Sequence, residues 1–152
     1  MELARPAGAT DRQACTRLLS RALLGAASMR GGAALVGEAT PVTLLDRWTR
    51  PGGAAHLLVG EYEGAVVGLL GVAVATETGG RRSSLIECCY VETGARGVGV
   101  GTALMEAAVA WCAAQGCTDV DALALPGDRT TKQRLEAAGF TARLLTLSRR
   151  LG

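Results

Sequence analysis

Three glycines alternate with valines directly before an apolar stretch of helical periodicity, in the segment 95–116 (ARGVGVGTALMEAAVAWCAAQG). Glycine costs about 1 kcal/mol relative to alanine inside a helix, so Gly97, Gly99 and Gly101 indicate positions that require the absence of a side chain, which leaves the backbone open. The first amides of a helix lack partners within it and carry partial positive charge. The segment therefore predicts an anion-binding loop with Arg96 beside it. An ordinary tight turn packed against a strand is the alternative.

The glycine spacing excludes two common phosphate-binding loops. The dinucleotide fingerprint G-x-G-x-x-G/A requires glycine or alanine where Leu104 stands. The P-loop requires a lysine directly after its last glycine, and no lysine follows a glycine in this segment. The predicted anion is therefore a phosphate ligand of another class.

The elements around this loop predict a βαβ unit. A β-branched run at 84–91 (SLIECCYV) precedes the loop, a helix is expected at 101–115, and a second strand is expected at 119–125. A strand, a crossover helix and a second strand in one sheet place the two strands parallel.

The rest of the chain predicts further strands and helices of a mixed α/β domain. Residues 56–62 and 65–76 form two apolar runs joined by Glu63-Gly64, which is typical of a hairpin. The other expected elements are an edge strand at 3–7, a helix at 10–23, a loop at 26–40, a short helix at 42–48, a helix at 130–138 and a final strand at 140–151.

Length and composition limit the class of protein. A chain of 152 residues is expected to form one domain, 1–152, and its net charge of +2 does not favour nucleic acid. Five cysteines without a C-x-x-C motif predict reduced thiols, and a single histidine, His56, argues against a metal site. Without a leader or membrane-spanning pattern, the chain is expected to be cytoplasmic and to bind no membrane.

Residues 96–101 (RGVGVG) match the [Q/R]-x-x-G-x-[G/A] signature, and the chain resembles the GNAT superfamily of acyl-CoA-dependent N-acyltransferases. The resemblance extends through 86–104 (IECCYVETGARGVGVGTAL) and 135–140 (LEAAGF), and more diffusely over the whole chain. It implies an α/β GNAT fold, whose mixed central sheet is mostly antiparallel with a parallel, splayed central strand pair, flanked by about four helices.

The resemblance implies acetyl-CoA as co-substrate. In this family the amides of the glycine loop hold the pyrophosphate, and backbone groups of the preceding strand bond the pantetheine arm. The residues expected to bind coenzyme A are Cys89, Tyr90, Val91, Arg96, Gly97, Val98, Gly99, Val100, Gly101, Thr102, Asp128 and Thr131. For Asp128 and Thr131, a role as helix caps is an equal alternative.

Glu87 is the candidate catalytic residue. A carboxylate inside an apolar strand is costly to bury unless it is paired or functional. Strand alternation would place Glu87 and Cys89 on one face and Tyr90 on the other. The stretch 86–91 (IECCYV) resembles the strand of members that acetylate polyamines and aminoglycosides, where the glutamate faces the acceptor amine. The expected function is acetyl transfer to a small primary amine, and an ion pair between Glu87 and an arginine is the alternative.

Leu135 departs from the family pattern, because many members carry there a tyrosine that protonates the coenzyme A thiolate. A non-catalytic domain that binds or senses coenzyme A, another reaction on an acyl-CoA-like ligand, and a protein or peptide N-acetyltransferase therefore remain alternatives. The region 26–40 is expected to lie over the acceptor or to be a plain connector. Exposed strand edges favour a homodimer.

Overall fold

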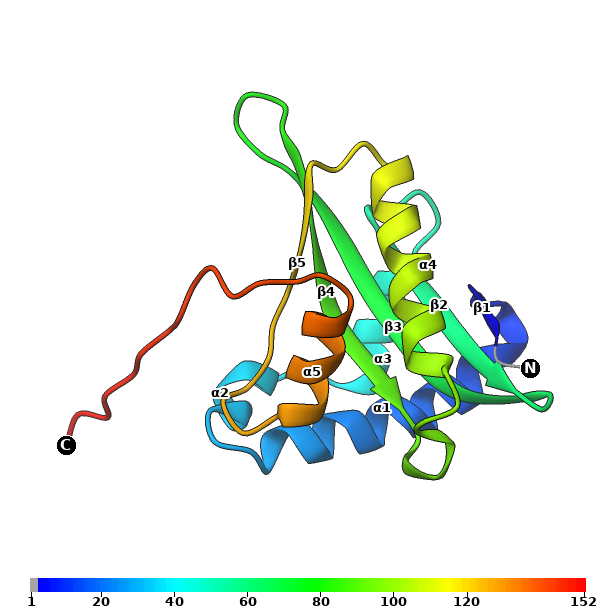
Figure 1. The fold of residues 1–152 in the computed structure, drawn as a ribbon, viewed down its shortest axis with the longest axis horizontal. Helices are drawn as coiled ribbons and strands as arrows, with labels where there is room; N and C mark the ends of the chain where they lie inside the picture. The colour runs from blue at the N-terminus through cyan, green and yellow to red at the C-terminus, as the bar shows by residue number, and fades with distance from the viewer. Residues whose placement is uncertain (1–2) are drawn as a thin grey trace.

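The computed structural model describes residues 3–152, which form a central sheet with helices on both faces (Figure 1). The strands are β1 (Leu3–Pro6), β2 (Ala55–Tyr62), β3 (Ala65–Thr76), β4 (Arg82–Val91) and β5 (Asp119–Ala122). The helices are α1 (Arg12–Ala27), α2 (Gly32–Val36), α3 (Pro41–Trp48), α4 (Val100–Ala114) and α5 (Arg129–Ala137). Two 3₁₀ turns, η1 (Ala9–Asp11) and η2 (Thr93–Ala95), precede α1 and α4.

The strands lie in the order β1-β2-β3-β4-β5. Neighbouring strands are antiparallel up to β4, and β4 and β5 are parallel, with pairs running from Ser83–Asp119 to Ile86–Ala122. This arrangement confirms the mixed sheet and the βαβ unit. The hairpin between β2 and β3 is also confirmed, since Glu63 and Gly64 have φ values of 51° and 79°. Two successive left-handed residues make the tight turn that suits a two-residue hairpin.

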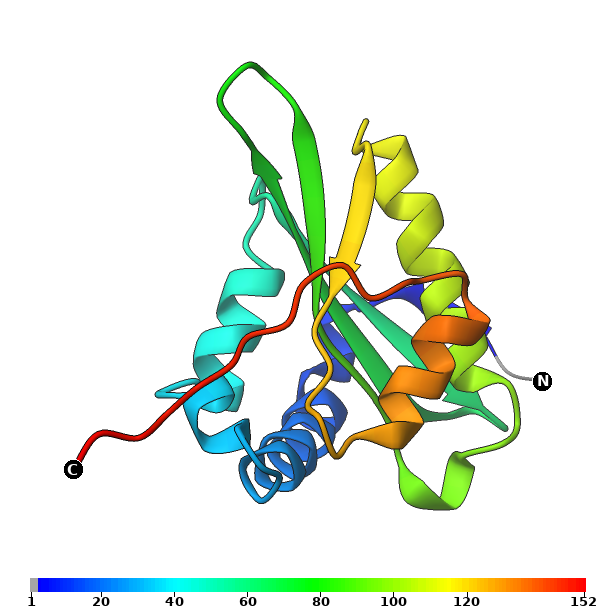
Figure 2. The ribbon, with the colours of Figure 1, turned by 60° about the vertical axis from the view of Figure 1, so that its left-hand side comes forward.

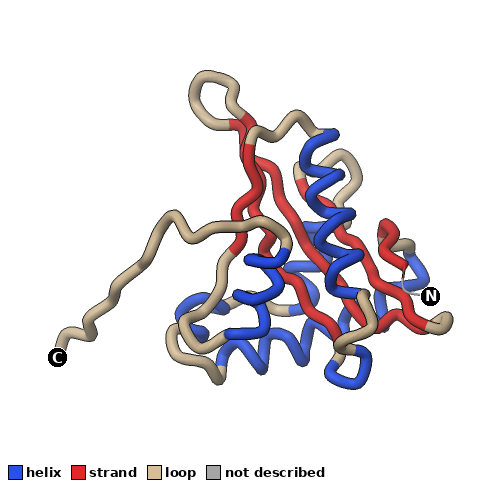
Figure 3. The backbone as a smooth tube through the Cα atoms, viewed as in Figure 1, coloured by secondary structure: helices blue, strands red, loops and turns tan. Residues whose placement is uncertain are grey.

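Two apolar layers enclose the sheet (Figures 1 and 3). Helix α4 lies on one face, where it buries Val100, Leu104, Met105, Ala108 and Cys112. Helices α1 and α3 lie on the other face, where they bury Cys15, Leu18, Leu19, Leu45 and Trp48. Glycines in the strands allow this close packing. A Cβ at Gly60 would collide with Val100, and one at Gly71 would collide with the Trp48 ring.

The prediction of a loop over 26–40 is wrong. Helix α1 continues to Ala27, and α2 occupies Gly32–Val36. A five-residue helix buries little surface, so it needs no apolar periodicity, and that periodicity was the signal the prediction required. A Cβ at Gly32 would lie 3.2 Å from Leu125, so this segment packs against the chain that follows β5.

The prediction of a final strand at 140–151 is also wrong. Residues 140–152 form neither strand nor helix, and the end of the chain extends away from the body of the molecule (Figure 1). Strand β5 likewise ends at Ala122 rather than at residue 125. The apolar alternation of this segment suits a strand. A strand forms only where its backbone N–H and C=O groups bond to those of another strand, and the local sequence does not specify that pairing.

Candidate functional site

An unpaired strand edge beside a small cavity marks the candidate site. Strand β5 ends at Ala122, while β4 continues from its last pair at Ile86 to Val91. Within residues 3–152, the β4 edge beyond Ile86 therefore has no strand on the β5 side. A cavity of about 30 Å³ lies here, and its lining includes Glu87, Cys89, Thr131, Arg134 and Leu135. Free backbone groups at such an edge can bond an extended ligand.

The glycine loop lies at the amino end of α4. Gly97 and Gly99 have φ values of 86° and 91°, in the left-handed region that glycine tolerates and valine does not. The first backbone bond of the helix joins Ala103 N to Gly99 O at 3.0 Å. The N–H groups from Val100 to Thr102 precede that bond, and no carbonyl within the helix accepts a hydrogen bond from them. These amides and the positive end of the helix can bind an anion.

The valines and the threonine of the loop differ in the exposure of their side chains. Val100 is buried in the core, Val98 is half-buried against it, and Thr102 is exposed. The two valines therefore fix the loop to the domain while their amides remain at the helix end. A role for these residues in binding coenzyme A stays a prediction.

Gly101 serves a different purpose from the other two glycines. A Cβ at Gly101 would lie 2.7 Å from Nε of Arg134, a residue of α5, so the missing side chain admits the guanidinium. Arg134 Nη1 lies 3.8 Å from the sulfur of Cys89. In residues 3–152, no carboxylate forms an ion pair with Arg134. A cation without an acidic partner thus lies between the β4 edge and the positive end of α4.

No local sequence pattern singles out Arg134. Three basic residues occur in α5, at positions 129, 132 and 134, and nothing in the spacing distinguishes one from another. The one available signal was its neighbour Leu135, which stands at the family's tyrosine position and is buried at the cavity.

Arg96 and Glu92 fix the start of the loop. Arg96 Nε donates to Val91 O at 3.0 Å, so the side chain ties the loop back to the end of β4. The Glu92 carboxylate accepts from Arg17 and Arg21 of α1 at 2.8 and 2.9 Å. The start of the loop is therefore tied to the end of β4 and to α1. Anion binding by Arg96 stays a prediction.

A β-bulge at Glu87 changes the faces of β4. Gly71 pairs with Cys88, and the next residue, Val72, pairs with Ile86, so Glu87 is the extra residue. The expectation of strict alternation is therefore wrong. Glu87 bonds to α3, and Cys88 and Tyr90 pack in the layer of α1 and α3, whereas Cys89 and Val91 pack in the layer of α4. Glu87 and Tyr90 thus share a face of the sheet.

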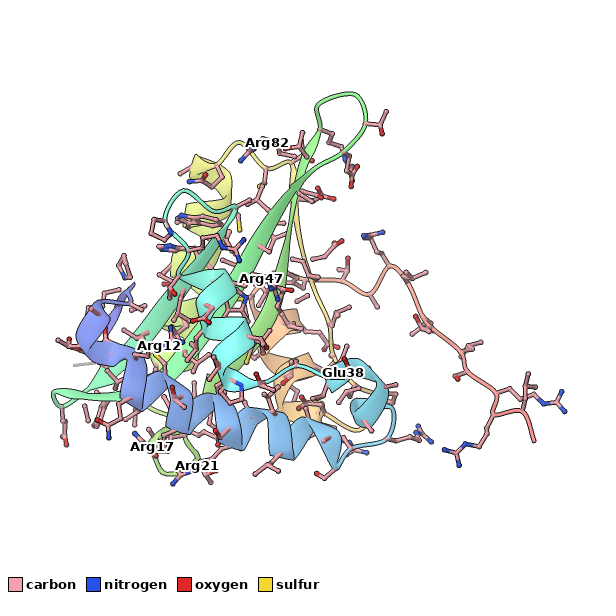
Figure 4. The ribbon with its side chains drawn as sticks, turned by 180° about the vertical axis from the view of Figure 1, so that it is seen from behind. Arg12, Arg17, Arg21, Glu38, Arg47 and Arg82 are labelled. Carbon is pink, nitrogen blue, oxygen red and sulfur yellow. The ribbon has the colours of Figure 1, made fainter. Side chains whose placement is uncertain are left out.

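Glu87 is held by two residues of α3, Arg47 and Trp48. Arg47 is labelled on α3 in Figure 4. The Glu87 carboxylate accepts from Arg47 Nη1 at 2.6 Å, from Arg47 Nη2 at 2.9 Å and from Trp48 Nε1 at 2.9 Å. The pKa of Arg47 is raised by this carboxylate. The ion pair that was the alternative for Glu87 is therefore present. Three of about four acceptor positions of the carboxylate are filled, and one on Oε2 remains open.

Asp128 caps α5. Its Oδ1 accepts from the amide of Thr131 at 3.1 Å, which satisfies one of the free donors at the start of the helix. The alternative of a helix cap is confirmed for Asp128. Thr131 also lines the cavity, and a contact of either residue with coenzyme A stays a prediction.

The two cysteines of β4 are poor nucleophiles. Burial raises the pKa of Cys88 to about 12 and also raises the pKa of Cys89. The thiolate is the reactive form of cysteine, so neither side chain is prepared for attack.

Metal and membrane sites are not evident in the described part of the chain. Residues 3–152 hold no group of three or more histidine, cysteine, aspartate or glutamate side chains placed to bind an ion. His56 stacks on Trp111 with ring centroids 4.9 Å apart, and burial lowers its pKa. None of the helices described between residues 3 and 152 has both the length and the apolar character to cross a membrane.

The chain belongs to the acetyltransferase (GNAT) family, whose family model matches residues 27–143. This match confirms the resemblance found in the glycine loop. No curated protein matches the chain.

Solved structures share its fold at low sequence identity. A tetramutant of the BH1408 protein from Bacillus halodurans is 15% identical, with a TM-score of 0.82 over 98% of this chain and 99% of that one. Glucosamine-6-phosphate N-acetyltransferase from Arabidopsis thaliana is 16% identical, with a TM-score of 0.72 over 100% and 99%. AAC(6')-Iy, in complex with the bisubstrate analogue CoA-S-monomethyl-acetylneamine, is 16% identical, with a TM-score of 0.72 over 99% of each chain.

Proposed function

We propose that this chain transfers the acetyl group of acetyl-CoA to a primary amine of a small molecule, by direct attack in a ternary complex. One observation carries the proposal. The edge of β4 that has no partner strand within residues 3–152 and Arg134 line one small cavity, and Arg134 lies against Gly101 of the glycine loop, so that backbone donors, a helix end and a cation lie close together. Such a combination suits a ligand with a diphosphate at one end and an extended amide-containing arm.

The glycine loop and Arg134 would bind the diphosphate of acetyl-CoA. The amides of residues 97–102 supply the donors, and Arg134 supplies a full positive charge against Gly101. The pantetheine arm would run along the β4 edge at residues 89–91, where its amides replace the missing strand. The thioester would then lie toward the bulge at Glu87.

Glu87 would take the proton from the acceptor amine. A primary amine with a pKa near 10.4 is almost entirely protonated at pH 7, and only the neutral amine attacks. The open acceptor position on Oε2 can bind the ammonium directly or through a water. The amine nitrogen attacks the thioester carbonyl, the carbon–sulfur bond breaks, and the thiolate leaves with the proton lost by the amine or one from water.

The half-buried Cys88 and Cys89 favour direct attack over an acyl-cysteine intermediate. A covalent route needs a thiolate near the thioester, and the raised pKa of Cys88 and of Cys89 opposes its formation. The free thiol of coenzyme A has a pKa near 8.5, so it can leave without the tyrosine that Leu135 replaces.

Two measurements test the proposal. Calorimetry with coenzyme A tests binding, and a thiol-release assay with acetyl-CoA tests transfer to a panel of polyamines, aminoglycosides, amino sugars and peptide amino termini. Thiol release with a small amine supports the proposal. Release with peptides alone would identify a peptide N-acetyltransferase instead.

A non-catalytic domain that binds coenzyme A is the second candidate. The buried Leu135 favours it, because the cavity wall there offers no proton donor. Binding of coenzyme A without thiol release from any amine would support this candidate. Absence of binding would exclude both.

A further inference from the structure

A second cavity lies between α1, α3 and β2, and we call it the α1–α3 cavity. Its volume is about 380 Å³, and its lining includes Asp11, Cys15, Leu45, Thr49 and Leu57. It shares no lining residue with the cavity at Glu87. Sites for small molecules have volumes of about 300–1,000 Å³, so this cavity is large enough to bind one.

The floor of the α1–α3 cavity is apolar. Cys15, Leu45 and Leu57 are only 1%, 1% and 4% exposed, so they form its deepest part. Arg12 and Thr49 are exposed and form its rim. An apolar floor with a few polar groups around it is the usual composition of a small-molecule site. The cavity can therefore bury the apolar body of a ligand.

The two charged side chains that line the cavity already have partners. Arg5 donates to Asp11 twice, from Nη1 to Oδ2 at 2.7 Å and from Nη2 to Oδ1 at 3.0 Å. Arg12, labelled on α1 in Figure 4, donates to Asp46 Oδ1 at 2.6 Å. A charged ligand would bury an unpaired charge or break one of these pairs, and either change costs free energy. The cavity therefore favours a neutral ligand.

Asp11 can accept one hydrogen bond from such a ligand. Its Oδ2 accepts from Arg5 and from Gly8 N at 2.7 Å, whereas its Oδ1 accepts from Arg5 alone. A carboxylate has about four acceptor positions, so one on Oδ1 remains open. Asp11 is only 6% exposed, and a hydrogen bond to it would be shielded from water. A ligand with one hydroxyl group would satisfy this position.

Helix α3 connects the α1–α3 cavity with Glu87. Leu45 and Thr49 are four residues apart, so they lie on one face at the end of the helix. Arg47 lies about 200° around the helix from Leu45, and Trp48 lies between these two sides. Arg47 and Trp48 hold the Glu87 carboxylate. A ligand against Leu45 and Thr49 would therefore contact the helix that fixes Glu87.

We propose that the α1–α3 cavity binds a neutral small molecule with an apolar body and one hydroxyl group, and that this ligand acts through α3 on the orientation of Glu87. The apolar body packs on Cys15, Leu45 and Leu57, and the hydroxyl donates to Asp11 Oδ1. The ligand favours the position of α3 that fits it best, which changes how α3 holds the carboxylate. A resulting change in the rate of acetyl transfer rests on the proposed function, whereas binding does not.

A titration of the full chain with benzyl alcohol, followed by heteronuclear NMR, tests the proposal. Benzyl alcohol is neutral and has one aromatic ring and one hydroxyl group. The backbone amide signals of residues 7–15 and 45–49 are expected to shift and to saturate, with a Kd of about 1 mM or lower. The Nε1–H signal of Trp48, which donates to Glu87, should shift with the same Kd. The Nε1–H signal of Trp111 on α4 is the internal control and should stay unchanged.

Two related compounds test the chemistry of the site. Toluene lacks the hydroxyl group and is expected to bind about tenfold more weakly than benzyl alcohol. Benzoate carries a charge that finds no free partner in the cavity, so it should not shift these signals at the same concentrations.

Two variants test the place of binding. Cys15→Met fills the floor of the cavity and is expected to weaken benzyl alcohol binding at least tenfold, with circular dichroism to check the fold. Ala9→Leu enlarges an exposed side chain of the lining without altering the core, and it should also weaken binding. Cys117→Met makes the same substitution as the first variant in the layer of α4 and should leave binding unchanged.

Four results would overturn the proposal. The first is the absence of saturable shifts at residues 7–15. The second is benzoate binding as tightly as benzyl alcohol. The third is a Trp48 Nε1–H signal that moves no more than that of Trp111. The fourth is unchanged binding to folded Cys15→Met and Ala9→Leu. Because none of these measurements involves coenzyme A or an acceptor amine, the proposal can fail while the acetyltransferase function holds.

Discussion

Glu87 occupies the extra position of a β-bulge, where it bonds two residues of α3. The bulge turns a carboxylate out of the regular strand alternation and places it at the end of the pairing between β4 and β5. Arg47 and Trp48 hold both oxygens in a fixed orientation. At the scale of the residue, a carboxylate with fixed geometry and one open acceptor position is suited to receive a proton from a bound amine.

Glu87→Gln is expected to lower kcat near neutral pH by roughly a hundredfold, because an amide cannot accept the amine proton. The Kd for coenzyme A should change little, and the pH–rate profile should change shape. Steady-state kinetics from pH 6 to 9 and calorimetry measure these effects. Glu106→Gln, on the exposed side of α4, is the control. An unaltered pH–rate profile would remove Glu87 from the mechanism.

Arg134→Gln is expected to weaken coenzyme A binding by about ten- to a hundredfold, because it removes a charged hydrogen-bond donor from the cleft. Binding of pantetheine, which lacks the diphosphate, should be unaffected. Calorimetry with both ligands tests this prediction. Arg129→Gln is the matched control, since five residues place Arg129 about 140° away around α5. Equal losses for the two ligands would contradict a role at the diphosphate.

The turn before α4 is the element on which ligand binding depends. Gly97 and Gly99 take left-handed conformations, and Gly101 leaves space for Arg134. Gly97 and Gly99 are therefore required by the backbone conformation, and Gly101 is required by the close approach of the Arg134 side chain.

Gly99→Val is expected to abolish coenzyme A binding, because a branched side chain at a φ of 91° forces the turn to rearrange. The fold should persist, as judged by circular dichroism. Gly79→Val is the control, since Gly79 has a similar φ of 93° at the tip of the β3–β4 hairpin, where a Cβ would meet nothing within 4 Å. Unchanged affinity for Gly99→Val in calorimetry would refute the role of the loop.

An ion-pair network joins β1, η1 and β2. Asp11 accepts from Arg5 Nη1 at 2.7 Å and from Gly8 N at 2.7 Å, and Arg5 also bonds Glu61. Asp11 is only 6% exposed, and Arg5 lowers its pKa. A lowered carboxyl pKa contributes stability above the unfolded value, near 4, and this contribution is lost as the pH falls through the folded value.

Asp11→Asn is expected to reduce the free energy of unfolding by about 1–3 kcal/mol at pH 7. The difference from the wild type should be constant above about pH 5 and should shrink below about pH 4. Urea unfolding at several pH values measures it. Asp46→Asn is the control, because Asp46 pairs with Arg12 on the surface. A difference independent of pH would show that the Asp11 charge is not the cause.

At the scale of the whole molecule, the cavity is lined by residues of β4, α4 and α5 and lies where the pairing of β4 with β5 ends. Figure 2 shows β5, α4 and α5 on the same side of the sheet. A ligand in this cleft would contact β4, the glycine loop and α5 together. Binding would therefore stabilise the folded chain as a unit rather than one element.

Coenzyme A at about 100 times its Kd is expected to raise the melting temperature by about 5–10 °C. This follows from roughly 2.7 kcal/mol of linkage and about 2–4 °C per kcal/mol for a chain of this size. Scanning fluorimetry with increasing coenzyme A measures the shift, with Gly99→Val as the control. No shift at any concentration would mean that the cleft does not bind coenzyme A.

Local sequence patterns determined most of the elements. The hairpin at Glu63-Gly64 and the helix expected at 101–115 were predicted correctly, because turn chemistry and helical periodicity are properties of adjacent residues. The resemblance to the GNAT family was inferred from the glycine loop, and the family match confirms it. The candidate residues of the loop could therefore be named from the order of amino acids by itself.

Only the tertiary structure decided the contacts between distant segments. Arg47 reaches Glu87 across forty positions, and Arg134 reaches Cys89 across forty-five. The bulge at Glu87 depends on the register between β3 and β4. Residues 140–151 stay outside the sheet, although within residues 3–152 the outer side of β5 has no partner strand. Local conformation is set by neighbours in the chain, whereas pairing partners are set by packing of the whole fold, and this is why the sequence alone did not reveal them.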